Sequence, residues 1–301
     1  MHDFQWHCAA PCRNVPVTFT LATLNSPTGT MHTTLCETFR SLAFRTFDQM
    51  GRARRVGHQP LEETFTDLNI LELKDRHPTE IFCQAFTKSQ EGKNGADWEW
   101  WLTDSLKSKW LGLRIQAKVL HLSSNTFAHL HYKSGKTKIY QSTILKRESA
   151  KDGLIPLYCL YLHDHSKFHK LIKHCGSFGC LAESYGCSLI PLSHVESLRK
   201  KKKANDLNSV ISNAHPWHCL VCCPGYGGDS LPERAWNMLS HGMSIPTSPN
   251  QTENKSEVGQ LFTRVTNEPP PYVRAIAEGQ RPDTITTSAW GVVVIKEANR
   301  G

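Results

Sequence analysis

Two neighbouring segments of the chain carry polar side chains whose types suit phosphodiester hydrolysis. In an extended strand successive side chains alternate faces, so Asp97 and Glu99 would share one face of a strand over 95–102. In a second strand over 113–119 the same alternation groups three polar residues opposite an apolar face: Arg114, Gln116 and Lys118. If the two strands pair, carboxylates, an amide and an ammonium group converge on one patch of sheet. Such a patch has the donors that a metal-and-water site needs.

The spacing of these residues resembles the signature of a nuclease superfamily. Asp97, followed about twenty residues later by Gln116-Ala117-Lys118, is similar to the Asp…(Glu/Gln)-x-Lys motif of PD-(D/E)XK, or restriction-endonuclease-like, nucleases in its Gln-x-Lys form. Ala96 replaces the proline of that motif, which carries no chemistry. The stretch Gly-Ala-Asp-Trp-Glu-Trp-Trp also resembles an uncharacterised bacterial family of such nucleases. The resemblance covers about residues 50–165 well and the remainder weakly.

The resemblance implies a fold, a cofactor and roles for four residues. The fold would be α/β, with a restriction-endonuclease-like core, a central mixed β-sheet flanked by helices, and a Cys/His-containing C-terminal extension. Asp97 would anchor Mg²⁺ or Mn²⁺, and Glu63, from an upstream helix, would supply a second carboxylate, with Glu62 as the register alternative. Gln116 would offer an uncharged amide oxygen. Lys118 would orient or deprotonate the attacking water and offset the charge of the transition state.

Other polar residues near the motif have open or secondary roles. Glu99 is either an additional metal-binding acid or a surface residue. Backbone phosphates of a nucleic acid would be held by four basic or imidazole side chains: Arg114, His121, Lys133 and Lys136. The resemblance favours DNA over RNA as the partner. Because two strands must be cut, a homodimer is expected by analogy.

The composition limits the class of protein without fixing its partner. The formal net charge is +8 and the sequence pI is about 8.9, a modest bias towards polyanions that ordinary basic proteins share. No apolar run is long enough to span a membrane, and the N-terminal residues lack a basic region leading into a hydrophobic segment, so we expect a cytoplasmic protein. The 11 cysteines, an odd number, then favour free thiols or metal ligands over a disulfide framework.

Hydrophobic periodicity places helices and strands around the motif. It predicts helices over 38–51, from Pro60 to Leu73, and over 139–150. The near-continuous apolar run over 154–162 predicts a strand buried on both faces of a covered sheet. We expect four regions along the chain: a poorly ordered extension (1–35), the nuclease-like core (36–170), a Cys/His-rich helical extension (171–243), and a linker with a terminal strand that could add to a sheet edge (244–301).

The Cys/His-rich region allows two interpretations. Cys219 and Cys222, beside His218, have the spacing of half a zinc site, and Cys187, Cys175 or Cys180 would have to complete it. The alternative is a set of buried cysteines without metal. Cys8 and Cys12 either belong simply to the poorly ordered N-terminal extension or bind a metal together with nearby histidines.

Two rival functions follow from these observations. One is a catalytically inactive nucleic-acid-binding module, and the other is an interaction protein organised by zinc. A cysteine hydrolase using Cys222 and His218 is a more distant third, because no orienting acid or oxyanion motif accompanies the pair. The setting of a nuclease would be restriction, phage defence or repair.

Overall fold

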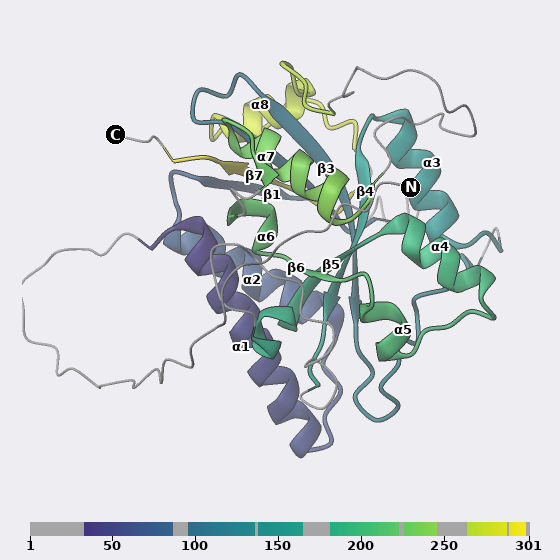
Figure 1. Ribbon diagram of the computed structural model, residues 1–301. Coiled ribbons are helices and arrows are strands. Elements are labelled where there is room, and N and C mark those ends of the chain that lie inside the picture. Colours follow the sequence, from purple (N-terminus) through teal and green to yellow (C-terminus); the bar gives the residue numbers. More distant parts are fainter. Residues whose placement is uncertain are drawn as a thin grey trace, which may run out of the picture. The chain divides into compact units, whose positions relative to one another are not determined.

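The computed structural model describes residues 33–86, 96–135, 138–164, 181–222, 226–245, 264–287 and 289–298 (Figure 1). Residues 33–301 form one compact unit. The expected N-terminal extension lies outside the described residues, apart from its last three positions. The main helices are α1 (Leu35–Arg55), α2 (Glu62–Arg76), α3 (Gln141–Lys151), α4 (Leu192–Lys200), α5 (Leu207–Ile211), α6 (Cys219–Cys222), α7 (Leu231–Asn237) and α8 (Pro271–Ala277), with the helical turns η3 (Ala182–Gly186) and η5 (Met238–Gly242).

One mixed β-sheet forms the centre of the described chain. Its strands are β1 (Ile81–Ala85), β2 (Trp98–Thr103), β3 (Trp110–Val119), β4 (Ile155–Tyr161), β5 (Cys187–Pro191), β6 (His215–Pro216) and β7 (Gly291–Lys296). They lie in the order β1-β7-β2-β3-β4-β5-β6. The β2–β3 and β4–β5 pairs are antiparallel, whereas β3–β4 and β2–β7 are parallel. The expected α/β class, with a mixed sheet flanked by helices, is therefore confirmed.

Apolar side chains on alternate positions of β2 bind helices to opposite sides of the sheet. Trp100 faces α1, where its ring lies 6.5 Å from that of Phe39. Trp101 joins a separate buried cluster with Tyr272, Val273 and residues of β7, so α8 covers the other side. The tryptophans of β2 are thus buried in the core, which is where large aromatic rings stabilise a fold most.

Helix α1 begins and ends where local chemistry dictates. Thr34 and Glu37 form a capping box at its start, which satisfies backbone N–H groups that the first turn leaves unpaired. Basic residues occupy its last turn, where the helix dipole favours positive charge. The helices predicted over 38–51, from Pro60, and over 139–150 correspond to α1, α2 and α3.

The C-terminal strand lies inside the sheet, and not at the edge where the sequence suggested it could add. β7 runs between β1, its antiparallel neighbour, and β2, its parallel neighbour. β5 and β6 extend the same sheet beyond β4, so the boundary expected at residue 170 does not separate two sheets. The linker expected after 243 lies largely outside the described residues.

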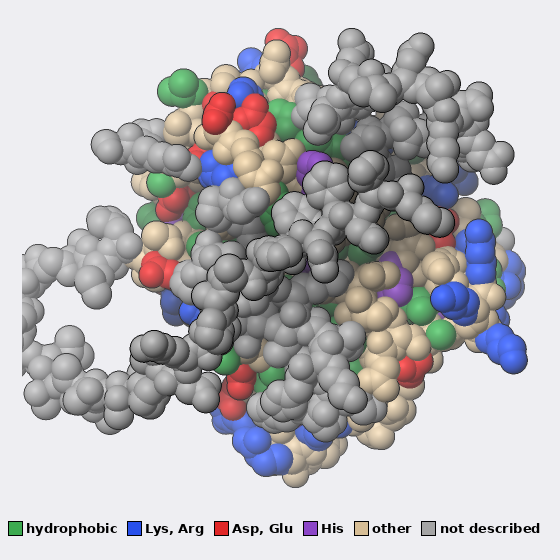
Figure 2. All heavy atoms as spheres, in the orientation of Figure 1, with side chains coloured by type: hydrophobic (Ala, Val, Ile, Leu, Met, Phe, Trp, Pro, Cys, Tyr) green, Lys and Arg blue, Asp and Glu red, His purple; other side chains and the backbone are tan. Residues whose placement is uncertain are grey.

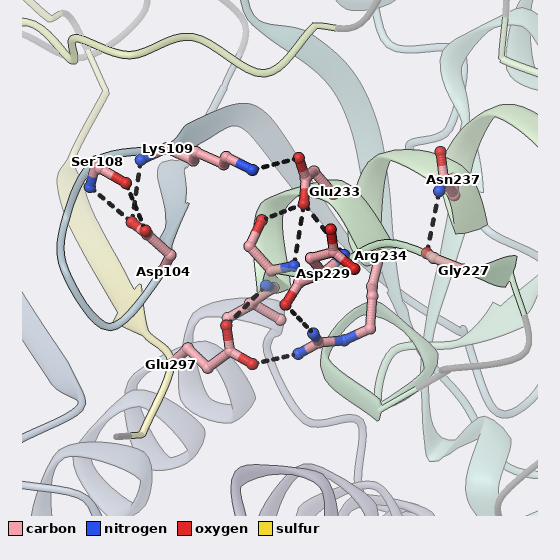
Figure 3. A network of polar contacts seen from close by, with 11 residues as sticks. Asp104, Ser108, Lys109, Gly227, Asp229, Glu233, Arg234, Asn237 and Glu297 are labelled. Atoms are coloured by element: carbon pink, nitrogen blue, oxygen red, sulfur yellow. Dashed lines mark hydrogen bonds and ion pairs between the residues drawn. The ribbon is translucent and has the colours of Figure 1, made fainter. Parts of the chain in front are cut away.

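A polar network ties α7 to the β2–β3 hairpin and to the end of β7 (Figure 3). Lys109 in the hairpin forms an ion pair of 2.6 Å with Glu233 of α7, and Arg234 forms one of 2.6 Å with Glu297. Glu233 also accepts hydrogen bonds from Ser230, which caps α7. These contacts hold the C-terminal part of the chain on the sheet.

None of the helices in the described part of the chain has the length and apolar character that crossing a membrane requires.

Candidate active site

Asp97 lies at the start of β2, where backbone hydrogen bonds fix it between two other strands. Its N–H donates to Ile115 O of β3 at 2.9 Å, and its carbonyl accepts from Trp290 N, just before β7, at 2.8 Å. The β2–β3 register pairs Trp98 with Ile115, so Asp97 faces Gln116 across the strands. The alternation expected from the sequence therefore holds at this position.

The Asp97 carboxylate is held by β3. Its Oδ2 accepts hydrogen bonds from Gln116 Nε2 at 2.6 Å and from the Ala117 N–H at 2.7 Å. Gln116 Nε2 also donates to Ala117 O at 3.2 Å. A carboxylate fixed by one amide and one backbone N–H keeps its remaining oxygen lone pairs for another ligand.

The first turn of α2 brings a second carboxylate to the same place. Glu62 Oε1 accepts a hydrogen bond from Lys118 Nζ at 3.2 Å; the Lys118 side chain is 5% exposed and that of Glu62 is 31% exposed. Acidic residues in a first helical turn are favoured by the helix dipole. Glu62, the register alternative to Glu63, is therefore the helical glutamate that pairs with Lys118.

Glu63 stays close to the site although its side chain is exposed. A crevice of about 20 Å³ is lined by Glu62, Glu63, Thr66, Asp67, Asp97, Trp98, Ala117 and Trp290. That volume is about what one water molecule or one ion occupies. The crevice therefore lies between the helix carboxylates and Asp97, at the end of the central strands.

Burial and charge act on Asp97 in opposite directions. Its pKa is raised to about 6, with burial as the largest cause and the negative charge of Glu62 adding to the rise. The nearby Lys118 ammonium and the hydrogen bonds from Ala117 and Gln116 oppose this rise. The net result is a carboxyl group that carries its charge at neutral pH at a cost, and a nearby cation would relieve that cost.

The donor set of the crevice fits a hard divalent cation. Glu62 and Asp97 supply two carboxylates, and Mg²⁺ is commonly bound through one or two carboxylates with water. Gln116 Oε1 is buried and accepts no hydrogen bond from the described part of the chain, so the site has one carbonyl oxygen without a partner. In the described ranges, no group of three or more His, Cys, Asp or Glu residues could hold a metal ion. Any cation here would therefore rely on amide or carbonyl oxygens and water for its other ligands.

Asp97→Asn tests this electrostatic description without a metal. A folded-state pKa near 6, raised from 3.8, means that the protonated carboxyl stabilises the fold fully below about pH 3.8 and that this stabilisation is lost as the pH rises through 6. In EDTA, the free energy of unfolding of the variant relative to wild type should therefore increase by about 2–3 kcal/mol between pH 4 and pH 8. Urea denaturation at several pH values measures this difference. A difference that does not change with pH would contradict the description.

Glu99 is not available as an additional metal-binding acid. Its side chain is fully buried, and Oε1 accepts from Arg114 Nη2 and Thr287 Oγ1, each at 2.5 Å. Oε2 accepts from Tyr272 OH at 2.7 Å. Glu99 shares a face of β2 with Asp97, as predicted, but α8 and the segment before β7 close that part of the face. The alternative expectation, that Glu99 is a surface residue, is also wrong.

The expectation that Arg114 binds phosphate is also wrong. Only 1% of it is exposed, and its Nη2 is paired with Glu99 and, at 2.7 Å, with Asp152. A guanidinium group that is already paired inside the protein cannot contact a nucleic acid. The buried pair anchors the sheet to the turn after α3.

The other expected phosphate-binding residues lie beyond the end of β3. His121 is partly exposed, and its ring lies 6.1 Å from that of His129. Lys133 is exposed, with its Nζ 4.7 Å from the centre of the Tyr140 ring. Lys136 lies outside the described residues.

The residues of the expected zinc site do not gather as a metal group among the described residues. Cys187 Sγ is buried and donates to Thr46 Oγ1 at 3.3 Å, and Asn69 Nδ2 lies 3.5 Å from the same sulfur. His218 and Cys219 are buried, and Cys222 is partly buried. Cys8, Cys12, Cys175 and Cys180 lie outside the described residues.

Tyr158 is a site neighbour that the sequence reasoning did not select. It pairs in register with Gln116, and its buried hydroxyl has no hydrogen-bond partner in the described ranges. Burial raises its pKa, and the negative charge of Asp97 raises it further. The sequence signal that could have indicated Tyr158 is a polar hydroxyl inside the apolar run over 154–162, once that strand is paired with the strand over 113–119.

A larger hollow elsewhere does not offer comparable chemistry. It has a volume of about 470 Å³, and the residues that line it include Lys109, Asp229, Glu233 and Trp236. Its carboxylate at Glu233 is already engaged by Lys109 and by the cap of α7 (Figure 3). The Asp97 crevice remains the better candidate.

The fold and the site define an α/β protein with acidic and basic side chains converging at one end of its central strands. Residues 35–301 match the model of a family described as a family of unknown function, DUF6615, and the chain belongs to that family. Comparison with curated proteins and with solved structures gave no match.

Proposed function

We propose that the protein is a metal-dependent nuclease of restriction-endonuclease-like architecture, with DNA as its preferred substrate. The observation that carries the proposal is that Glu62 and Asp97 line one small crevice, while Gln116 and Lys118 hydrogen-bond to these two carboxylates. The arrangement of elements supports it: an acid-bearing helix upstream of the antiparallel β2–β3 pair, with β1 between them, and then α3 leading to a strand parallel to β3.

The side chains of the crevice divide the chemistry among them. Bound Mg²⁺ or Mn²⁺ would supply Lewis-acid polarisation of the phosphate and a more acidic water. Asp97 and Glu62 would hold the cation, and Gln116 would keep the Asp97 carboxylate oriented while offering its amide oxygen. Lys118 Nζ, kept in place by Glu62, would donate hydrogen bonds to the phosphate and stabilise the charge that develops there.

Cleavage assays with the wild-type protein test this proposal. Supercoiled plasmid, linear duplex, single-stranded DNA and RNA would each be incubated with Mg²⁺ or Mn²⁺, and with EDTA as the control. We expect metal-dependent nicking or linearisation of the plasmid. Absence of cleavage of every substrate with both metals would contradict the proposal.

The two glutamates at the start of α2 form a matched pair of variants. Glu62→Gln should reduce cleavage by about 10²-fold, because it removes a carboxylate from the cation and the ion-pair partner from Lys118. Glu63→Gln should change cleavage less than about threefold, because the Glu63 side chain lines the crevice from a more exposed position than that of Glu62. Steady-state cleavage rates compare the two. The opposite ranking would assign the helical carboxylate to Glu63.

A catalytically inactive nucleic-acid-binding module is the second candidate. It is favoured by Gln116, which stands where the nuclease superfamily commonly has Glu and brings no charge to the Asp97 carboxylate. Binding of duplex without cleavage under any metal would favour this alternative. Under the nuclease proposal, the setting is cytoplasmic restriction, phage defence or repair, and the active form is a homodimer because two strands must be cut.

A further inference from the structure

Exposed cations gather where α4 ends and face the loop before α3. Five consecutive basic residues, Arg199 to Lys203, lie at the end of α4 and in the turn that follows it, and all but Arg199 are exposed. Lys133, Lys138 and Lys146 are exposed on the neighbouring loop and on α3. Figure 2 shows Lys and Arg side chains grouped at the right-hand edge of the molecule, where Figure 1 places α4.

Tyr140 holds two of these cations in place. Lys133 Nζ lies 4.7 Å from the centre of its ring, and Arg199 Cζ lies 4.6 Å from the same centre. Arg199 Nη1 also donates to Ser142 Oγ at 3.1 Å and to Thr143 Oγ1 at 2.9 Å. Two side chains of like charge are therefore fixed around one aromatic ring, which distinguishes them from freely solvated cations.

Acidic side chains nearby offset only part of this charge. Glu196 pairs with Lys146 at 3.1 Å and lies 3.9 Å from Arg199, but within the described part of the chain no ion pair involves residues 200–203. Lys202 and Lys203 also adopt φ values of 54° and 58°, a region that costs energy for residues with a side chain. Unpaired like charges and strained backbone both lower stability, so a partner that neutralises them would explain their presence.

Strand β4 connects this basic group to the candidate active site. Tyr158 pairs in register with Gln116, and the pKa of Tyr158, raised mainly by burial, is also affected by Asp97 and by Arg199. The two charges therefore act on one side chain from the crevice and from α4. Helices α3 and α4 both pack on β4, which carries Tyr158.

We propose that the surface formed by Lys133, Tyr140, Arg199 and Lys200 to Lys203, the α4 basic surface, binds the sugar–phosphate backbone of a nucleic acid duplex and presents it to the Asp97 crevice. The presentation step rests on the proposed nuclease function, whereas binding by this surface does not. Contacts to phosphates carry affinity without reading base sequence. Binding is therefore sensitive to salt and tolerant of sequence.

The test compares two triple variants of equal charge. Lys201→Gln, Lys202→Gln and Lys203→Gln remove three cations from the α4 basic surface. Arg52→Gln, Arg55→Gln and Lys74→Gln remove three exposed cations from α1 and α2. Fluorescence anisotropy with a labelled DNA duplex, in EDTA and over a range of NaCl concentrations, measures affinity without cleavage. Thermal unfolding checks that both variants fold.

The α4 variant should bind at least about tenfold more weakly, and its slope of log affinity against log salt should be smaller in magnitude by about 2–3. The control variant should bind within about threefold of wild type. Equal effects of the two variants, or no effect of either, would overturn the proposal. The same measurement with an RNA duplex of equal length shows whether the surface binds the backbone of DNA or that of RNA more tightly.

Two further outcomes separate this inference from the nuclease function. Vesicles rich in phosphatidylserine test whether the α4 basic surface binds a membrane instead. If the α4 variant loses vesicle binding while its duplex binding is unchanged, the proposal is also overturned. Weakened duplex binding by the α4 variant supports it even if the wild type cuts no substrate, in which case only the nuclease function fails. If the α4 variant binds and cleaves duplex as well as the wild type, the binding role of the α4 basic surface is contradicted, whereas the catalytic role of the Asp97 crevice is not.

Discussion

Lys118→Ala should lose about 10²–10³-fold of the metal-dependent cleavage rate while retaining duplex binding. The Lys118 ammonium lies beside the carboxylates of Glu62 and Asp97, and donors aimed at developing charge contribute this much in other active sites. Its side chain is 5% exposed, so water does not take over its role readily. Cleavage rates under saturating duplex measure the loss.

Lys109→Ala provides the matched control. Lys109 also pairs with a glutamate, Glu233, at 2.6 Å, but far from the crevice and in an exposed network (Figure 3). Its removal should change cleavage by less than about threefold, because exposed ion pairs contribute little to stability. Equal losses in the two variants would mean that Lys118 acts through the fold and has no special part in the reaction.

Glu99→Ala should lower the free energy of unfolding by about 3–5 kcal/mol. The change leaves the Arg114 guanidinium buried with only the half-exposed Asp152 as its partner, and an uncompensated buried charge costs about that much. It also removes the acceptor of Tyr272 OH and Thr287 Oγ1. Urea denaturation at pH 7 measures the effect.

Two comparisons make this second prediction specific. The double variant Glu99→Ala with Arg114→Met should recover much of the lost stability, because no buried charge then remains unpaired. Glu72→Ala, which breaks the more exposed ion pairs of Glu72 with Arg45 and Arg76, should cost only about 0–1 kcal/mol. If Glu99→Ala keeps the stability of the wild type and loses only cleavage, the prediction fails and Glu99 is again a candidate metal-binding acid.

The face of the β2–β3 pair could be predicted from the sequence because strand alternation is a local property. Period-two spacing brings Asp97 to Gln116 and Glu99 to Arg114, and the register agrees. What lies over each half of that face is not local. Glu99 is closed off by Tyr272 and Thr287, which lie 173 and 188 residues further along the chain.

The choice between the two helical glutamates depended on a helix boundary. Adjacent residues in a first turn point in directions about 100° apart, so an uncertainty of one residue in where α2 begins changes which carboxylate faces the sheet. The position of β7 in the sheet could not be predicted from the sequence, for a different reason. Its apolar run predicts a buried strand, but pairing with both β1 and β2 is decided by contacts across the whole chain.

The most direct measurement is the position of a divalent cation in crystals of the protein soaked in Mn²⁺. The proposal predicts an anomalous difference peak in the crevice, about 2.1 Å from a carboxylate oxygen of Asp97 and coordinated also by Glu62, directly or through water. The same peak should be absent from Asp97→Ala crystals and present in Glu63→Gln crystals. A wild-type crystal with Mn²⁺ elsewhere, or with no peak between Asp97 and Glu62, would contradict the central claim.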